Sequence, residues 1–225
     1  MNKTLAIAAS AALALMATTA QVAKASDAIP YPHSGTYNNA TYSFTASATG
    51  DVIAYFAGSG AGYDNQLGLL VNGVAQGGFG LDDHTTTIGT AYDFGSVTAG
   101  DSLVFVLKNI TLGKDAYSLP ALNGSYDNGP ATGTTDGHNH IYSTSYTDSA
   151  ASPANLVAAL IPAGTYVAFE DLPFPGSDYN YFDESFVFTN VSASVPEPGA
   201  WAMMLLGFGG LGAMMRSRRQ QAVSA

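Results

Sequence analysis

The segment from Glu170 to Glu184, EDLPFPGSDYNYFDE, holds the side chains of this chain best suited to bind a metal ion. Carboxylate and amide oxygens recur around a loop that contains Pro and Gly, and calcium takes roughly six to eight such oxygens in flexible geometry. The spacing is not that of an EF-hand loop. The alternative is a turn whose Asp and Asn side chains cap backbone groups. The candidate calcium ligands are Glu170, Asp171, Asp178, Asn180 and Asp183.

Two histidines, His138 and His140, could bind zinc or copper together with a carboxylate. If they open a strand, their rings share a face, because alternate residues of a strand point the same way. His84 follows two aspartates and is a possible partner, and such a set would suit a metal-dependent hydrolase. The alternative is that these are surface or loop histidines. His33, next to prolines and tyrosines, is expected to be a packing residue.

The chain lacks the sequence patterns of common hydrolases. It has neither a G-x-S-x-G elbow nor an H-E-x-x-H motif. It has no cysteine, which excludes thiol chemistry and thiolate zinc sites. Paired carboxylates of the glycosidase kind are present, but most aspartates stand in Gly- and Asn-rich turns, a pattern that favours solvated loops. We therefore expect a protein that is not an enzyme.

Tyrosines in Gly- and Asn-rich contexts indicate a different possible function, the stacking of sugar rings. Aromatic faces combine apolar area with hydroxyl hydrogen bonding. Tyr179 and Tyr181 are therefore candidate ligand-binding residues of a carbohydrate-binding module for exopolysaccharide. Tyr63 and Tyr126 stand in similar contexts. Other aromatic residues alternate within predicted strands and are expected in the core, namely Tyr42, Phe44, Phe186 and Phe188.

The distribution of charge excludes some classes of partner. The chain carries 17 acidic and 7 basic residues. Between residues 26 and 194 only Lys108 and Lys114 are basic, against 16 acidic residues, so this part has a net charge of −14. It offers no basic footprint for nucleic acid and no arginine to hold phosphate. Divalent cations, cationic surfaces and neutral sugars remain suitable partners.

Short apolar or alternating runs, separated by Gly, Asn, Asp and Pro, predict an all-β fold, an antiparallel β-sandwich of jelly-roll-like form. Asn72-Gly73 is the strongest hairpin signal. Residues 155–161 predict either one helical turn or a strand, and residues 113–139 predict a long loop. The predicted strands are Thr41–Thr45, Asp51–Ala57, Gln66–Val71, Asp101–Lys108, His140–Tyr146, Thr165–Glu170 and Glu184–Val191.

The first residues have the three parts of a secretory signal peptide. Lys3 gives the positive region, residues 5–17 the apolar region, and Ala23-Lys24-Ala25 a small-x-small cleavage site. The apolar region is too short to span a bilayer comfortably. We expect a signal helix in residues 1–25, cut after Ala25 or alternatively after Ala20, and therefore an exported chain.

The end of the chain combines a proline-fixed turn, an uncharged run over residues 201–215 and a basic cluster. This order resembles a PEP-CTERM sorting signal. The resemblance implies a single apolar helix, an exosortase that recognises and processes the tail, and transient retention at the inner membrane. Release to the cell surface or an extracellular polysaccharide matrix would follow. The residues that carry the motif are Val195, Pro196, Glu197, Pro198, Arg216, Arg218 and Arg219.

A second likeness covers parts of the central region. Glu170, Asp171 and Leu172, followed after a glycine loop by Asp178 and Asp183, are similar to the E-D-L-x-x-G-x-D-x-D-x-N-D segment of an uncharacterised β-domain family of exported bacterial proteins. Residues 61–68, AGYDNQLG, are similar to its A-G-Y-x-N-x-L-G segment. This chain departs from the pattern by having an asparagine at 180 and a phenylalanine at 182. The resemblance supports the all-β fold and favours calcium.

We therefore divide the chain into a signal peptide (1–25), a β-sandwich domain (26–194) and a sorting tail (195–225). The expected role is that of a non-enzymatic surface or biofilm matrix component, stabilised by calcium. A carbohydrate-binding module and a metal-dependent hydrolase are the alternatives.

Overall fold

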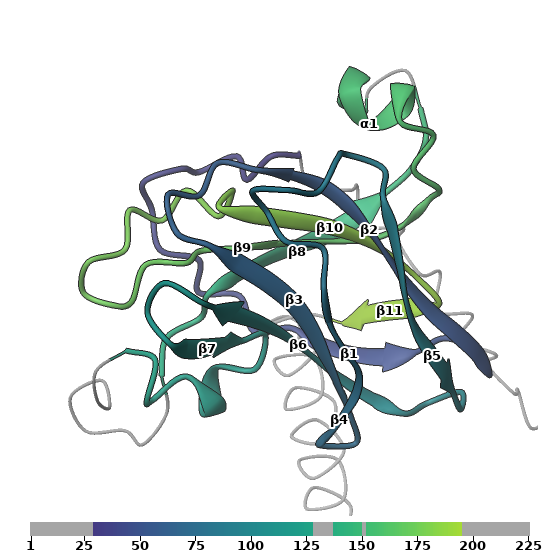
Figure 1. Cartoon of the computed structure of the whole chain (residues 1–225), viewed down its shortest axis with the longest axis horizontal. Helices are drawn as coiled ribbons and strands as arrows, with labels where there is room; N and C mark the ends of the chain where they lie inside the picture. The colour runs from purple at the N-terminus through teal and green to yellow at the C-terminus, as the bar shows by residue number, and fades with distance from the viewer. Residues whose placement is uncertain (1–28, 128–136, 150–151, 195–225) are drawn as a thin grey trace, which may run out of the picture.

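The computed structural model describes residues 29–127, 137–149 and 152–194. The predicted signal helix and the predicted apolar helix of the tail lie outside these residues. Within the described ranges, no helix has both the length and the apolar character needed to cross a bilayer. The described part is built almost entirely from β-strands, which confirms the predicted all-β class (Figure 1).

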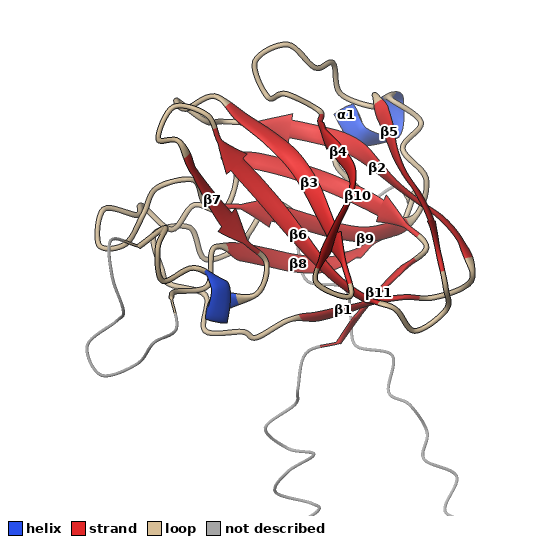
Figure 2. Ribbon diagram, turned by 60° about the horizontal axis from the view of Figure 1, so that its bottom comes forward, coloured by secondary structure: helices blue, strands red, loops and turns tan. Residues whose placement is uncertain are grey.

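The strands form two antiparallel sheets that face each other (Figures 1 and 2). The first sheet has the order β11-β1-β6-β3-β4, with β7 beside β6, and consists of β1 (Ser43–Ala46), β3 (Asn65–Val71), β4 (Val74–Gly80), β6 (Ser102–Asn109), β7 (Lys114–Tyr117) and β11 (Val191–Ser194). The second sheet has the order β5-β2-β10-β9-β8 and consists of β2 (Gly50–Ser59), β5 (Ala91–Val97), β8 (Ile141–Tyr146), β9 (Gly164–Phe169) and β10 (Glu184–Thr189).

The pairing is nested along the chain. Strand β1 pairs with β11, β2 with β10, and β3 with β6, so early strands meet late ones and the middle of the chain pairs with itself. Winding a long antiparallel hairpin around a sandwich produces such nested pairs, and jelly rolls are built in this way. The first and last described strands therefore lie side by side.

Four strands (β4, β5, β7 and β11) and one short helix (η1, Pro120–Leu122) were not among the specific predictions. Strand β4 reads VAQGGFG and β5 reads AYDFGSV, and their glycines and exposed residues hide the alternation that marks a strand. The segment 113–139, expected to be a single long loop, contains β7 and η1. The alternatives for residues 155–161 are settled in favour of a helical turn, α1 (Ala154–Ala158).

The main hydrophobic core lies between the two sheets. The rings of Phe105 and Phe188 stack across it with centroids 3.9 Å apart, and Phe44 meets Phe105 edge-on at 4.9 Å. Tyr42, Phe44, Phe186 and Phe188 are all buried, which confirms the predicted core positions. Both sheets thus contribute aromatic residues to this core, and most of them come from strands of the second sheet.

A second apolar cluster covers the outer face of the second sheet. The segment before β1 contributes Tyr31, and α1 contributes Leu156, both buried against Tyr142 and Val187 of the sheet. The second sheet is therefore buried on both faces.

Several chain segments meet at one end of the sandwich. Strand β9 ends at Phe169, which lies opposite Glu184 at the start of β10. Glu184 in turn lies opposite Ser59 at the end of β2. From the first sheet, Asn65 at the start of β3 hydrogen-bonds Asp171, the second residue after β9. The acidic segments of the sequence are gathered at this end.

Candidate metal centre

Three of the predicted calcium ligands form one buried group. Glu170 and Asp171 follow the end of β9, and Asp183 precedes β10, so the loop between these strands brings them together. One carboxylate oxygen from each lies within 4.8 Å of the others. The residues are 1%, 2% and 6% exposed. We refer to Glu170, Asp171 and Asp183 as the first acidic centre.

Neutral amide donors fix the carboxylates of the first acidic centre. The Asp171 N–H donates to Asp183 Oδ2 at 2.8 Å, and the Asn65 side chain donates to Asp171 Oδ2 at 2.8 Å. Glu170 Oε1 accepts from the Leu172 N–H at 3.2 Å. These bonds orient the carboxylates but bring no positive charge to them.

The pKa values of the three carboxyl groups reflect the free-energy cost of burying them together. Burial, and to a smaller extent neighbouring carboxylates, raise the pKa of Glu170 to about 7 and that of Asp183 to about 8. Burial also raises the pKa of Asp171 above its ordinary value. Desolvation and like charges both disfavour the ionised form. A divalent cation would relieve both costs, because carboxylate oxygens are the ligands that calcium prefers.

The other two predicted ligands lie outside this group. The Asp178 carboxylate is exposed and accepts from the backbone N–H and the side-chain amide of Asn180, at 3.0 and 3.1 Å. The Asn180 side-chain oxygen accepts from the Phe182 N–H at 2.7 Å. Asp178 and Asn180 therefore form the capped turn that was the alternative interpretation, and the structure reduces the predicted set of five ligands to three.

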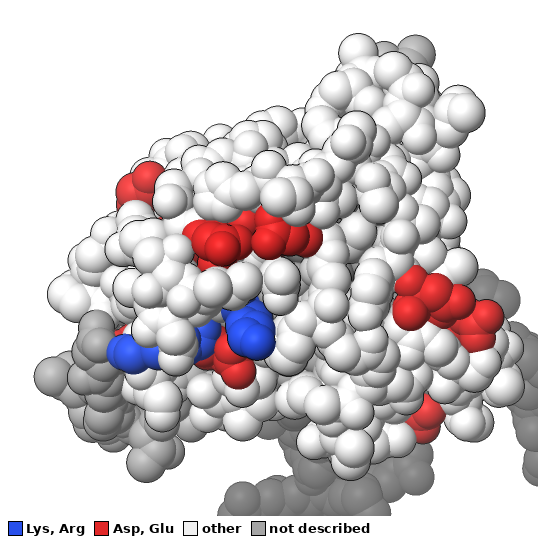
Figure 3. Space-filling view, in the orientation of Figure 1, with Lys and Arg blue, Asp and Glu red and all other residues white. Residues whose placement is uncertain are grey.

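Figure 3 shows one face of the molecule. Acidic side chains lie there in separate small groups, basic side chains gather in one area, and the rest of that face is uncharged. On this face an attraction for cations would therefore come from local groups of carboxylates rather than from a continuous acidic surface.

The prediction that Tyr181 presents a sugar-stacking face is wrong. Tyr181 is 0% exposed, and its hydroxyl accepts from the Asn38 N–H at 3.0 Å. Tyr126 is buried as well. Tyr179 is half-buried and meets Tyr37 edge-on, with ring centroids 5.7 Å apart. Loop tyrosines that lie in Gly- and Asn-rich sequence can thus be core residues when the loop folds back onto the domain.

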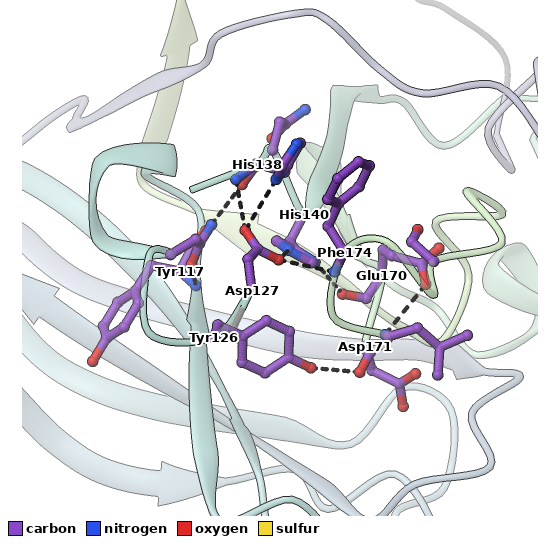
Figure 4. Close-up of polar contacts among 12 residues, drawn as sticks. Tyr117, Tyr126, Asp127, His138, His140, Glu170, Asp171 and Phe174 are labelled. Carbon is purple, nitrogen blue, oxygen red and sulfur yellow. Dashed lines mark hydrogen bonds and ion pairs between the residues drawn. The ribbon is translucent and has the colours of Figure 1, made fainter. Parts of the chain in front are cut away.

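His138 and His140 both contact one carboxylate, that of Asp127, but they do so as part of a network of hydrogen bonds and ring contacts (Figure 4). Asp127 Oδ1 lies 2.7 Å from His140 Nε2, and Asp127 Oδ2 lies 3.4 Å from His138 Nδ1. The His138 ring also stacks on Phe174 at 3.6 Å. Asp127 was missed in the sequence, because a single aspartate in a long loop carries no signal of a partner that is 13 residues away.

Hydrogen bonding leaves His140 no free ring nitrogen. Its Nδ1 lies 3.0 Å from the backbone oxygen of Glu170, and its Nε2 faces the Asp127 carboxylate. Both ring nitrogens are thus engaged, and Asp127 Oδ1 also accepts from the Phe174 N–H at 3.0 Å. The prediction that His140 is a zinc or copper ligand is wrong for this arrangement.

The two remaining histidines lie elsewhere. His84 is exposed, and its Nδ1 lies 3.3 Å from Asp83 Oδ1 and 3.8 Å from Asp64 Oδ1. One ligand atom from each of these three residues lies within 4.8 Å of the others. We refer to Asp64 and Asp83 as the second acidic centre, which the sequence patterns did not single out. His33 is exposed and has one edge-on ring contact, with Tyr31 at 5.7 Å.

The all-β domain ends with the short strand β11, and the predicted sorting tail follows it directly. Residues 194–219 match the family model of the PEP-CTERM protein-sorting motif. The match confirms the sorting signal and identifies an exosortase-sorted exported protein that is held at the membrane before processing. Searches with the chain found no significantly similar protein of curated function and no significantly similar solved structure.

Proposed function

We propose that this protein is a non-enzymatic component of the cell surface or extracellular polysaccharide matrix, with a domain that calcium stabilises at the first acidic centre. The observation that carries the proposal is the position of the sorting motif. The matched segment begins at Ser194, which is also the last residue of β11. No linker therefore separates the domain from the sorting motif, so processing of the motif would act on the whole folded domain.

The geometry of the first acidic centre supports a structural rather than a catalytic role. A glycosidase places two carboxylates on either side of a sugar that must reach them. Glu170, Asp171 and Asp183 are at most 6% exposed, so a polysaccharide chain has no access to their oxygens. A bare cation needs far less room.

The sorting part of the proposal is tested in cells. The wild-type chain is compared with a variant in which Pro196, Glu197 and Pro198 are replaced by alanine, in a strain that has an exosortase. We expect the wild-type chain to be shortened and released to the surface or matrix fraction, and the variant to stay at full length in the membrane fraction. Equal release of both chains would overturn the assignment.

The calcium part is tested by thermal unfolding in EGTA and then in millimolar calcium. A ligand at 100 times its Kd stabilises the folded state by about 2.7 kcal/mol, which is a rise of several degrees in Tm. We expect this rise in the wild-type chain and a much smaller rise in Asp183→Asn. The matched control is Asp178→Asn, because Asp178 lies outside the group and should keep the full rise.

One observation favours carbohydrate binding as a second candidate function. Four half-buried aromatic rings form a row in which each ring contacts the next. The ring centroids lie 5.7 Å apart for Tyr179 and Tyr37, 5.9 Å for Tyr37 and His138, and 3.6 Å for His138 and Phe174. Partly exposed aromatic rings of this kind can stack against sugars. Retention on the producing cell's polysaccharide, lost in Tyr37→Ala and Tyr179→Ala, would support this candidate, and unchanged retention in both variants would exclude it.

A further inference from the structure

Glu184, the first residue of β10, has a carboxylate without a partner. The residue is 0% exposed, and neither carboxylate oxygen has a hydrogen-bond partner among the described residues. A buried polar group without a partner costs free energy, and a buried unpaired charge costs much more. Both Glu184 oxygens are therefore buried acceptors that a bound cation could complement.

The surroundings of Glu184 increase the cost. The carboxylates that interact with Glu184 belong to Asp83, Asp82, Asp171 and Asp64, in order of decreasing effect. Glu184 also lies opposite Ser59 on β2, whose hydroxyl donates to Asp83 Oδ2 at 3.3 Å. The Glu184 carboxylate thus faces the second acidic centre.

Two neighbouring oxygens share this lack of a partner. Asp64 Oδ1 and Asn65 Oδ1 are buried and accept no hydrogen bond from any described residue. With the two oxygens of Glu184, four buried acceptors without a hydrogen bond therefore occur in residues that border one group of carboxylates. A single hydrogen-bond donor would complement one of these oxygens, whereas one cation can bind several oxygens at once.

We propose that Glu184, Asp64, Asp83 and Asn65 form a second cation site, distinct from the first acidic centre, and that calcium is its ligand. The proposal deepens the proposed function, since it adds a site to a domain that calcium is already proposed to stabilise. All four residues offer oxygen ligands, as calcium requires. Zinc favours nitrogen and sulfur ligands, and His84 is the one nitrogen ligand grouped with this centre among the described residues.

Asn65 connects the two sites. Its backbone N–H donates to Asp83 Oδ1 at 2.8 Å, and its side-chain nitrogen donates to Asp171 Oδ2 at 2.8 Å. With the amide nitrogen directed at the first acidic centre, the unpartnered amide oxygen is left for the second site. Asn65 therefore orients ligands of both sites.

The second site would join the two sheets. Asp64 and Asn65 stand at the start of β3 and Asp83 follows β4, so these three ligands come from the first sheet. Glu184 comes from β10 of the second sheet. A cation held by all four residues would link the sheets at the end of the sandwich where the acidic loops meet.

The test counts metal ions on the full exported chain, purified in detergent with its tail. After equilibrium dialysis against calcium, bound calcium per chain is measured by elemental analysis. We expect two ions on the wild-type chain, one on Glu184→Gln and one on Asp183→Asn. Asp64→Asn serves as a second variant of the new site, because Asp64 is only half-buried and its replacement leaves the fold intact. His84→Ala is the matched control and should keep both ions.

Thermal unfolding of the same proteins tests whether calcium engages Glu184. In EDTA, Glu184→Gln should unfold at a higher temperature than the wild type, because the amide removes the cost of burying a carboxyl group without a partner. In calcium the order should be reversed. The same order in both conditions would show that calcium does not engage Glu184 and would overturn the proposal.

The remaining outcomes separate the two proposals. One ion that is lost in Asp183→Asn but kept in Glu184→Gln would overturn the second site and leave the first intact. Binding of zinc but not calcium, lost in His84→Ala, would overturn the assignment of calcium. No bound calcium at all would remove both sites, while the cell-fractionation result for the sorting motif would stand unaffected.

Discussion

The carboxylate of Asp127 and the imidazole ring of His140 form a buried pair, with Oδ1 and Nε2 2.7 Å apart. Burial alone would raise the pKa of Asp127, but the hydrogen bond and charge of His140, together with two backbone N–H donors, hold it below its ordinary value. The pair attaches the loop after η1 to the start of β8, beside the first acidic centre.

Removing one partner of this pair should be strongly destabilising. Asp127→Ala leaves His140 Nε2 and the backbone N–H groups of His138 and Phe174 without their partner, and each unsatisfied buried group costs about 1–3 kcal/mol. Urea unfolding at neutral pH, followed by circular dichroism, measures the loss. The exposed Asp148→Asn is the control and should change the free energy of unfolding by about 0.5 kcal/mol or less. Equal effects in both variants would show that the pair does not stabilise the fold.

The stability of the metal-free protein should fall as the pH rises. Glu170 and Asp183 have folded-state pKa values of about 7 and about 8, against ordinary values of 4.5 and 3.8. Folding therefore favours the protonated forms. Their contribution is fully present below the ordinary values and is lost as the pH rises through the folded values.

In EDTA, the free energy of unfolding should thus be larger near about pH 5.5 than near about pH 8.5. Calcium should weaken or reverse this trend, because the metal competes with protons for the same oxygens. Denaturant unfolding at the two pH values, with and without calcium, is the measurement. A metal-free protein that becomes more stable toward high pH would contradict the assignment.

The stacked pair of Phe105 and Phe188 should be a main contributor to the core. Phe188→Ala removes a fully buried ring and leaves a cavity, which costs about 3–5 kcal/mol. Val74→Ala, at a position that is 70% exposed, should cost about 0.5 kcal/mol or less. The shift in the midpoint of urea unfolding checks both values.

Tyr181→Phe tests the corrected role of this tyrosine. Loss of the hydroxyl leaves the buried N–H of Asn38 without its acceptor, which costs about 1–3 kcal/mol. Tyr179→Phe is the matched control, because Tyr179 is half-buried and edge-on to Tyr37. Thermal unfolding and polysaccharide retention are measured on both. A stable Tyr181→Phe variant that no longer binds polysaccharide would restore the original sugar-stacking interpretation.

Local patterns predicted the parts of this fold that local physics determines. The turn Asn72-Gly73 has positive φ at both residues, 50° and 82°, which is why these two residue types mark a tight hairpin. The alternating aromatic residues of β1 and β10 predicted core positions, because alternate residues of a strand point to the same face of the sheet. Strand β4 escaped prediction because its glycines accommodate the close approach of Phe94 and Tyr92, a requirement set by another strand.

The site was predictable only in part because its partners are far apart in sequence. Glu170, Asp171 and Asp183 lie within one loop, so their spacing alone suggested a shared ligand. Asp127 meets His140, and Glu184 faces Asp64, only after the two sheets have packed. No residue spacing encodes such contacts, and the burial that makes Glu184 unusual is a property of the folded domain.

The position of β11 has a mechanical consequence for a protein that is held by its tail. Strand β11 is an edge strand, paired with β1 through the four residues Val191–Ser194 and attached to the second sheet where Thr165 Oγ1 donates to the Val191 oxygen at 2.8 Å. Any force on the membrane-held tail enters the domain at Ser194 and loads this short ladder before any other strand. Detaching β11 would spare the stacked rings of the central core, so the domain can yield at its edge under tension and remain folded.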